Sequence, residues 1–383
     1  MKKILGLLSA LLVLSACGSS DQGGGSKLIL GMNFDLSGGG ASYGQAESKG
    51  AKLAVKLYNE KGGFKGEDVV VKEYDNQTVE AEAYRVQTVL ADEDQVFAII
   101  GATTSGTSVS ANKASVEFKV PTISPSATAD KVTNNGKKGY EYVYRVCFAD
   151  SFQGITMANF ASNTMNISNV AIIGDSSQDY AKGLMEYFTD QFTSNGGNVV
   201  ATEYYVKGDK DFASVLTKLK GDSSIEALFI PGYYDEVGLI IKQARELGIT
   251  LPILGVDGFE SPELMNIAGA ANLNDVYYSN HYSNSLESAE RTAFVDVYKA
   301  EYNGEEPNGF AALAFDAANL ALDALDRAGE PDAAKVDAAI FDTKDLKGVT
   351  GAVSFDDLHN AVKSAVVIEL VDGVDAKATL INP

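Results

Sequence analysis

Short apolar runs alternate with amphipathic segments along most of the chain. Val96–Gly101 reads Val-Phe-Ala-Ile-Ile-Gly, which is typical of a strand covered on both faces. The other predicted strands are Lys27–Phe34, Asp68–Tyr74, Val120–Ser124, Asn169–Gly174, Asn198–Val206, Ile225–Pro231 and Leu251–Val256. Helical patterns lie between them at Gln45–Glu60, Val79–Ala91, Tyr180–Ser194, Phe212–Lys220 and Glu236–Leu247. This alternation predicts βαβ units and parallel sheets.

The last third of the chain has more helix than strand. Helical patterns cover Glu287–Tyr302, Gly309–Arg327 and Asp332–Phe341, and strand character returns at Ala361–Val371. A chain of 383 residues exceeds one typical hydrophobic core. We therefore expect an α/β protein with two lobes.

The N-terminus predicts export and a lipid anchor. Two lysines precede an apolar run from Ile4 to Leu14. A membrane-spanning helix needs about 20 apolar residues, so this shorter run is typical of a signal peptide. The run ends in Leu14-Ser15-Ala16-Cys17, which looks like a bacterial lipobox, although an ordinary signal peptide with a chance cysteine is the alternative. We expect residues 1–16 to be a signal peptide and residues 17–26 a lipidated, Gly/Ser-rich flexible tether.

Charge and cysteine content restrict the partners. The net charge of −21 would repel a phosphate backbone, which argues against nucleic acid. If Cys17 carries lipid, that lipid is the only contact with the membrane, and the protein is anchored outside the cytoplasm. Cys147 then has no cysteine partner for an intrachain disulfide, and we expect it to pack in the core.

Sequence motifs of the common enzyme classes are absent. The chain has two histidines, His281 in a polar-aromatic loop and His359 in an acidic turn, and neither has another histidine or cysteine at metal-ligand spacing. There is no G-x-x-x-x-G-K-[ST] phosphate loop and no G-x-S-x-G nucleophile elbow. We therefore expect a protein that is not an enzyme and uses no metal or cofactor. A hydrolase is kept as a rival class.

Hydroxyl side chains follow two predicted strands of the first half. Ser105 and Thr107 come after the strand that ends at Gly101, where a helical pattern begins, and Ser126 and Thr128 follow the next strand. Ligands of open α/β sheets bind beyond the carboxyl ends of strands, and a helix N-terminus there favours an anion. The alternatives are an ordinary helix cap and an ordinary Pro/Ser turn.

In the second half, strand ends carry tyrosines and a carboxylate. Tyr180, Tyr233 and Asp257 each follow a predicted strand. Tyrosine can cover an apolar ligand body and offer one hydroxyl, and Asp257 could pair with an ammonium group. For Asp257 a simple Asp-Gly turn is the alternative.

A series of motifs carries a family resemblance. They are Ser42-Tyr43-Gly44, Lys49-Gly50-Ala51, Asn59 to Gly66, Ile123 to Thr128, Asp150 to Gly154, Asp179 to Gly183, Gly232-Tyr233-Tyr234 and Phe310 to Asp316. In this order they resemble the leucine/isoleucine/valine-binding proteins, extracytoplasmic receptors of ABC transporters with the type I periplasmic-binding fold. The chain is most similar to the lipid-anchored branched-chain amino-acid receptors of Gram-positive bacteria, over nearly all of Lys27–Pro383.

The resemblance implies roles for the candidate residues. Ser105 would hold the ligand α-carboxylate through its hydroxyl and backbone N–H. Thr128 would contact the carboxylate or the ammonium, and Ser126 would offer its backbone carbonyl to the ammonium. Asp257 stands where close relatives carry the acidic partner of the ammonium, and some of them have the longer Glu there.

Three tyrosines and the lobe boundaries complete this expectation. Tyr43, Tyr180 and Tyr233 would line the cleft, and Asp150 falls near the first crossing between lobes. Residues 27–149 with about 279–353 would form the first lobe, and residues 150–278 with about 354–383 the second. Each lobe would be a mostly parallel sheet flanked by helices, and about three crossings would join them.

The resemblance implies a monomeric receptor that captures a free aliphatic amino acid between its lobes. It would deliver leucine, isoleucine or valine to the permease subunits of an ABC importer. Two alternatives remain open: the same fold binding another small solute, such as an amide, urea or another amino acid, or a sensory receptor without transport.

Overall fold

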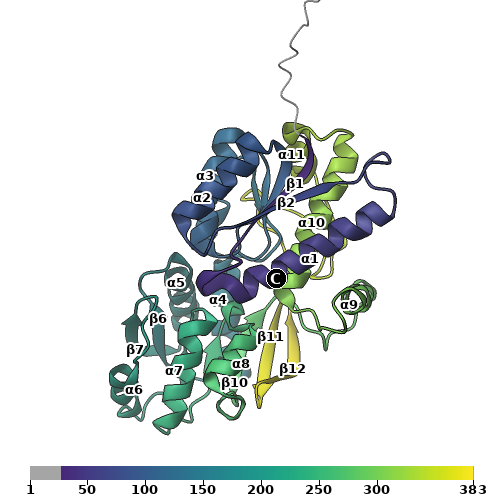
Figure 1. Cartoon of the computed structure of the whole chain (residues 1–383). Coiled ribbons are helices and arrows are strands. Elements are labelled where there is room, and N and C mark those ends of the chain that lie inside the picture. The colour runs from purple at the N-terminus through teal and green to yellow at the C-terminus, as the bar shows by residue number, and fades with distance from the viewer. Residues whose placement is uncertain (1–26, 383) are drawn as a thin grey trace, which may run out of the picture.

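The computed structural model describes residues 27–382, which form two α/β lobes, each built on its own sheet (Figure 1). In Figure 1 the lobe with β1 and α3 lies above, the lobe with β6 and α7 lies below, and α1 runs along their boundary. The predicted signal peptide, the Cys17 lipidation site and the tether lie outside the described residues, as does Pro383.

The first lobe has a sheet of five parallel strands in the order β2-β1-β3-β4-β5. The strands are β1 (Lys27–Phe34), β2 (Val70–Asp75), β3 (Val96–Gly101), β4 (Thr122–Ser124) and β5 (Val143–Arg145). The helices of this lobe are α1 (Ala41–Glu60), α2 (Glu80–Thr88), α3 (Ser105–Phe118), α9 (Ala289–Glu301), α10 (Gly309–Ala328) and α11 (Ala333–Phe341). Every residue of β3 is buried, which confirms the prediction of a strand covered on both faces.

The second lobe has a sheet of seven strands in the order β12-β11-β10-β9-β8-β6-β7. The strands are β6 (Asn169–Asp175), β7 (Asn198–Tyr205), β8 (Ala227–Phe229), β9 (Ile253–Gly255), β10 (Val276–Asn280), β11 (Ala365–Val371) and β12 (Val374–Ile381). The first five are parallel to one another, and β11 and β12 add an antiparallel edge. The helices are α4 (Asp150–Asn159), α5 (Asp179–Ser194), α6 (Ala213–Lys220), α7 (Tyr234–Glu246) and α8 (Pro262–Ala268).

The strand order of each sheet marks a place for a ligand. β1 lies between β2 and β3, and β6 lies between β7 and β8, so the order of connection reverses beside β1 and beside β6. In open α/β sheets, ligands bind beyond the carboxyl ends of the strands at such a reversal. The two lobes touch across these edges. The Oγ atoms of Ser42 and Ser261 are 2.8 Å apart, and Lys131 Nζ is 3.2 Å from Asp179 Oδ2.

The chain passes between the lobes three times. It leaves the first lobe between β5 and α4, returns after β10, and enters the second lobe for the last time at β11. Residues 355–361 still pack on the first sheet, because the His359 ring stacks on Tyr144 with centroids 4.7 Å apart and His359 Nδ1 is 2.9 Å from the Val143 carbonyl. We therefore propose that the last crossing lies between Asn360 and Ala365, a few residues beyond the expected boundary at residue 353.

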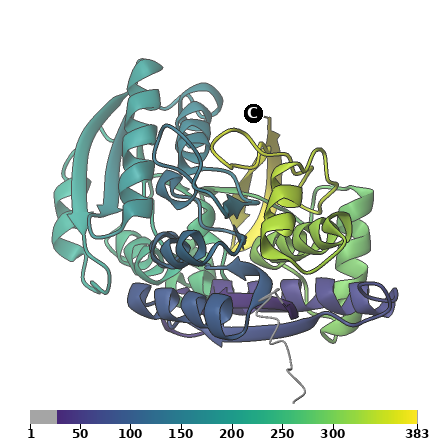
Figure 2. The ribbon, with the colours of Figure 1, turned by 90° about the horizontal axis from the view of Figure 1, so that it is seen from above.

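Close packing against α10 holds α1 in place where the two lobes meet. A Cβ atom on Gly50 of α1 would lie 1.9 Å from the Ala311 carbonyl oxygen of α10, so only glycine permits the approach. The view from above (Figure 2) shows the purple α1 along one side of the molecule and the yellow C-terminal strands nearer its middle. Since α1 carries Tyr43 toward the second lobe, this packing positions a candidate site residue.

Candidate ligand-binding site

All seven predicted site residues line one cavity between the lobes. The cavity is also lined by Thr103, Thr104, Gly258 and Phe310. We call the hydroxyl residues of the first lobe (Thr103, Thr104, Ser105, Ser126 and Thr128) the first wall, and Tyr180, Tyr233, Asp257 and Gly258 the second wall. A larger hollow of about 820 Å³ around Pro262 and Tyr282 contains none of the seven.

The first wall presents a helix N-terminus. Ser105 is the first residue of α3, and its Oγ accepts a hydrogen bond of 3.2 Å from the Ala129 backbone N–H. The first N–H groups of a helix have no partner within it and carry a partial positive charge. This part of the wall therefore suits an anionic group.

Ser126 and Thr128 differ in how far their side chains are already engaged. Ser126 Oγ is 2.9 Å from the Thr103 carbonyl and also contacts Glu47, so its side chain is fully used. Thr128 Oγ1 is buried and has no hydrogen-bond partner among residues 27–382. A buried hydroxyl without a partner is costly, and Thr128 lines the cavity, where either a ligand or the neighbouring Asp150 carboxyl could satisfy it.

Two buried carboxyl groups support the first wall from behind, and sequence analysis missed both. Asp35 directly follows β1, and Glu47 lies on α1 one turn after Tyr43. Asp35 Oδ2 accepts a hydrogen bond of 2.9 Å from Thr104 Oγ1, and burial raises the pKa of Asp35. Glu47 Oε2 accepts one of 2.6 Å from Thr103 Oγ1. The loop that begins α3 is thus held from below by side chains.

The hydrogen bonds around Glu47 favour its protonated form. Ser126 Oγ lies beside Glu47 Oε1 and the Thr103 carbonyl, but a hydroxyl has one proton to donate. A protonated Glu47 can donate to Ser126, which then donates to Thr103, and every contact is satisfied. Burial raises the pKa of Glu47 to about 8. A neutral carboxyl group therefore holds Ser126 in place at neutral pH.

The second wall presents the Asp257 carboxylate. Its Oδ1 accepts a hydrogen bond of 2.5 Å from the Tyr180 hydroxyl, and its Oδ2 is 3.2 Å from His281 Nε2. Its backbone N–H donates to Gln153 Oε1 at 2.9 Å. Asp257 is 3% exposed, yet no lysine or arginine lies within 4 Å of it among the described residues. A buried carboxylate without a cation is well suited to binding an ammonium group.

Aromatic rings line the space between the two walls. Tyr180 and Tyr233 stack with centroids 4.7 Å apart, and Tyr43 stacks on Phe310 at 4.4 Å. The Tyr43 hydroxyl donates to the Gly258 carbonyl at 2.5 Å and so joins the lobes. Burial raises the pKa of Tyr43, Tyr180 and Tyr233 well above the usual value, so all three stay neutral. The cavity is therefore polar at its walls and aromatic in between.

Asp150 lies beside the cavity rather than on it. It begins α4 at the first crossing, and its Oδ2 is buried without a hydrogen-bond partner in the part of the chain that the structure describes. Burial, and then the nearby Asp257, raise its pKa well above the usual value. Burial therefore favours the protonated form of Asp150 over the charged form that would compete with Asp257 for a cation.

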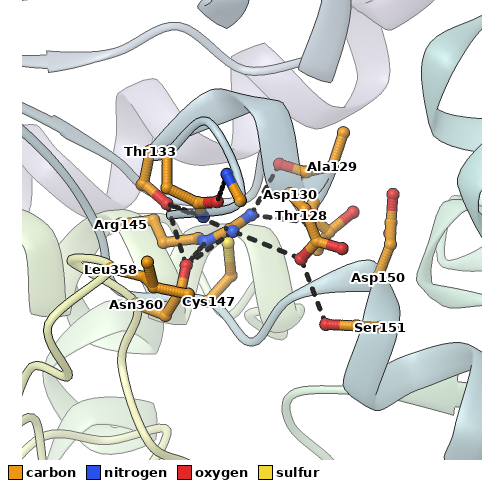
Figure 3. A network of polar contacts seen from close by, with 12 residues as sticks. Thr128, Ala129, Asp130, Thr133, Arg145, Cys147, Asp150, Ser151, Leu358 and Asn360 are labelled. Carbon is orange, nitrogen blue, oxygen red and sulfur yellow. Dashed lines mark hydrogen bonds and ion pairs between the residues drawn. The ribbon is translucent and has the colours of Figure 1, made fainter. Parts of the chain in front are cut away.

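A buried arginine ties the first wall to the last crossing (Figure 3). Arg145 Nη1 donates to the carbonyls of Thr128 at 2.6 Å and Ala129 at 2.9 Å, while Nη2 donates to Asn360 Oδ1 at 2.6 Å. The guanidinium is fully buried, and Asp130 Oδ1 lies 3.8 Å from Nη2. Arg145 therefore fixes the loop that carries Thr128 relative to the segment between the lobes.

The sequence also identifies relatives of this two-lobed molecule. Residues 28–375 match a family model described as "periplasmic binding protein", and the match covers both lobes and both walls of the cavity. The chain belongs to the periplasmic binding protein family. This is a family of solute-binding receptors rather than of enzymes.

Several relatives of this periplasmic binding protein have names that specify a ligand. The Leu/Ile/Val-binding protein homolog 3 of Brucella melitensis is 29% identical over 86% of this chain and 87% of its own length. The leucine-specific-binding protein of Salmonella typhimurium is 33% identical over 62% of each chain.

Solved structures show the same architecture. The branched-chain amino acid transporter substrate binding protein LivJ of Streptococcus pneumoniae, in complex with isoleucine, is 40% identical and has a TM-score of 0.88, covering 93% of this chain and 99% of its own. A leucine binding protein of Thermotoga maritima is 34% identical with a TM-score of 0.86 and the same coverage. The predicted two-lobed α/β fold and the family resemblance are confirmed.

Among residues 27–382 of this periplasmic binding protein, none of the helices has the length and apolar character needed to cross a bilayer. No group of three or more His, Cys, Asp or Glu side chains in that range could hold a metal ion. Cys147 is buried and unpaired there, and burial raises the pKa of its thiol to about 12, in keeping with packing in the core.

Proposed function

We propose that this periplasmic binding protein is an extracytoplasmic receptor of an ABC importer that captures a branched-chain or other aliphatic amino acid. The observation that carries the proposal is the placement of a helix N-terminus and a buried carboxyl group on opposite walls of one cavity. A zwitterion satisfies both at once. The names of the Brucella and Salmonella relatives, and the isoleucine in the Streptococcus structure, support an aliphatic amino acid.

The proposal assigns each end of the ligand to one wall. The carboxylate would accept hydrogen bonds from the Ser105 backbone N–H and hydroxyl. The ammonium would donate to Asp257 and to the Ser126 backbone carbonyl, and Thr128 Oγ1 would find its missing partner in either group. The aliphatic side chain would pack among the rings of Tyr43, Tyr180, Tyr233 and Phe310.

Capture would close the lobes. Only the closed arrangement brings Ser105 and Asp257 to the same ligand, so a ligand that binds both favours closure. The closed receptor would then dock on the permease subunits and release its cargo. We further propose that the receptor acts as a monomer without catalysis and that a lipid on Cys17 anchors it to the outer face of the cytoplasmic membrane.

A panel of ligands tests this function. We expect leucine, isoleucine and valine to raise the melting temperature of the protein by mass action, and calorimetry to give a single site. Urea and simple aliphatic amides, which lack both charged ends, should leave the melting temperature unchanged. Stabilisation by such an uncharged amide, or by none of the twenty amino acids, would contradict the proposal.

The sensory alternative needs a separate measurement, because both receptors would bind the same ligand. A strain that lacks this protein should lose uptake of labelled leucine and regain it when the gene is restored. Unchanged uptake would favour a receptor that signals without transport.

A further inference from the structure

His281 contacts the proposed ammonium-binding group from the side away from the cavity. It directly follows β10, at the start of the second crossing between lobes, and its side chain is buried. Its Nε2 is 3.2 Å from Asp257 Oδ2, whereas the Tyr180 hydroxyl binds the other carboxylate oxygen. Each oxygen of Asp257 thus faces one protein side chain.

The surroundings of the imidazole determine which nitrogen carries the proton. Nδ1 is buried and has no hydrogen-bond partner among the described residues, so a proton there would have no acceptor. Nε2 faces a carboxylate, which only accepts hydrogen bonds when ionised. The arrangement is satisfied when the ring is neutral with its proton on Nε2.

Burial keeps the ring in that state. The ring stacks on Phe148 of the first crossing with centroids 3.6 Å apart and 24° between planes. Burial has the largest effect and lowers the pKa of His281, the buried Lys363 lowers it further, and the hydrogen bond and charge of Asp257 act in the opposite direction. A neutral His281 is a fixed hydrogen-bond donor rather than a second cation beside the ligand.

We propose that His281 is a positioning residue that orients Asp257 toward the ammonium of the bound amino acid. Tyr180 and His281 donate one hydrogen bond to each oxygen and so fix the plane of the carboxylate. The remaining lone pairs are left for the ligand. A second hydrogen-bonded residue that orients a binding group in this way is common at metal sites, and here it serves an organic cation. The inference rests on the proposed function.

Two substitutions separate this role from simple packing. His281→Leu keeps a buried apolar side chain against Phe148 but removes the donor, whereas the amide of His281→Gln can still donate to Asp257. We expect the leucine variant to bind leucine more weakly by a factor of roughly 10 to 100, the range for a lost hydrogen bond to a charged group. The affinity of the glutamine variant for leucine should stay within about threefold of the wild-type affinity. This difference is well below the tenfold change that 1.4 kcal/mol represents.

The outcomes of this calorimetric comparison are distinct. Equal affinity of the leucine variant and wild type, or equal losses in both variants, would overturn the proposal. Melting temperatures of the free proteins show whether either variant is unfolded. If wild type itself binds none of the amino acids, the proposed function fails instead.

A spectroscopic measurement keeps the proposal testable even if the leucine variant does not fold. The chain has only two histidines, so nitrogen NMR of histidine-labelled protein can be assigned with a His359→Gln variant. We expect His281 to show the neutral form with the proton on Nε2, with no titration between pH 6 and 8. A proton on Nδ1, or titration at an ordinary histidine pKa, would overturn the proposal without any ligand.

Discussion

The first wall of the cavity offers hydroxyl and backbone N–H groups, whereas the second offers a carboxylate flanked by tyrosine rings. The side chains that support each wall from behind have the opposite chemical character. Buried carboxyl groups, Asp35 and Glu47, hold the hydroxyls of the first wall, and a neutral imidazole and Gln153 hold the carboxylate of the second.

This difference shows how one cavity can bind both ends of a zwitterion. A wall that binds an anion must present donors, and here these are the first N–H groups of α3, because the hydroxyls of Thr103, Thr104 and Ser126 already donate their protons to protein acceptors. A wall that binds a cation must present acceptors, so its supports are donors. Because each wall belongs to a different lobe, neither lobe alone can hold both ends of the ligand.

The largest expected effect is on the stability of the first wall. Arg145→Met would remove the charged donor from the carbonyls of Thr128 and Ala129 and from the side chain of Asn360, each of which keeps one neutral donor. A hydrogen bond to a charged group contributes about 1.5–3 kcal/mol, so we expect the free energy of unfolding to fall by about 3–5 kcal/mol in urea denaturation. The control Arg85→Met removes an exposed arginine of α2 and should change it by less than about 1 kcal/mol. Similar losses in both variants would show that the buried network adds nothing.

The next largest effect is on the binding of leucine by the second wall. Asp257→Ala removes the partner of the ammonium, and truncation of one member of a desolvated charge pair costs about 2–5 kcal/mol of binding free energy. Calorimetry with leucine measures this loss. Asp296→Asn, which removes a charge from the exposed face of α9, is the matched control and should bind leucine like wild type. Full affinity in the Asp257 variant would exclude it as the ammonium partner.

A smaller loss of binding free energy is expected from a substitution in the first wall. A modified ligand then distinguishes the roles of the two walls. Ser105→Ala removes one hydrogen bond to the carboxylate, which is worth about 1.5–3 kcal/mol, while the backbone N–H remains. Leucinamide keeps the ammonium but lacks the carboxylate charge, so the Ser105 substitution should matter much less for it than for leucine. The Asp257 substitution should weaken both ligands. If both substitutions affect the two ligands alike, the assignment of ligand ends to walls is wrong.

Per pH unit, the smallest effect concerns the pH dependence of stability. Because the pKa of Glu47 is raised from the ordinary 4.5 to about 8, its contribution to stability is fully present below pH 4.5 and is lost as the pH rises toward 8. Relative to Glu47→Gln, wild type should lose up to about 1.4 kcal/mol of unfolding free energy per pH unit in this window. Urea denaturation at pH 5, 6, 7 and 8 measures the slope. The exposed control Glu67→Gln should keep the wild-type slope, and an unchanged slope in the Glu47 variant would mean that Glu47 is ionised throughout.

Much of the fold could be predicted because its strands are short apolar runs between helices. β1 and β3 have the predicted bounds, and β6, β7, α5 and α10 differ from the prediction by one residue at one end. The prediction missed β12 because that edge strand is largely exposed and carries charged residues. It missed β10 because its polar end, Tyr278-Ser279-Asn280, resembles a loop.

The seven site residues could be brought together because they follow one rule, that ligands bind beyond the carboxyl ends of parallel strands. Asp35 obeys the same rule directly after β1 and could have been included. Glu47 sits on a helix among charged residues and looks solvent-exposed, although it shares the face of Tyr43 one turn earlier. The groups behind the walls lack such a signal, since His281 and Asn360 reach their partners only through the tertiary fold.

A crystal structure of the protein grown with leucine tests the central account most directly. We predict the ligand carboxylate within hydrogen-bond distance of the Ser105 backbone N–H and the ammonium within hydrogen-bond distance of Asp257, with the two lobes closed around it. A ligand bound wholly to one lobe, or held with its charged ends reversed, would contradict the account.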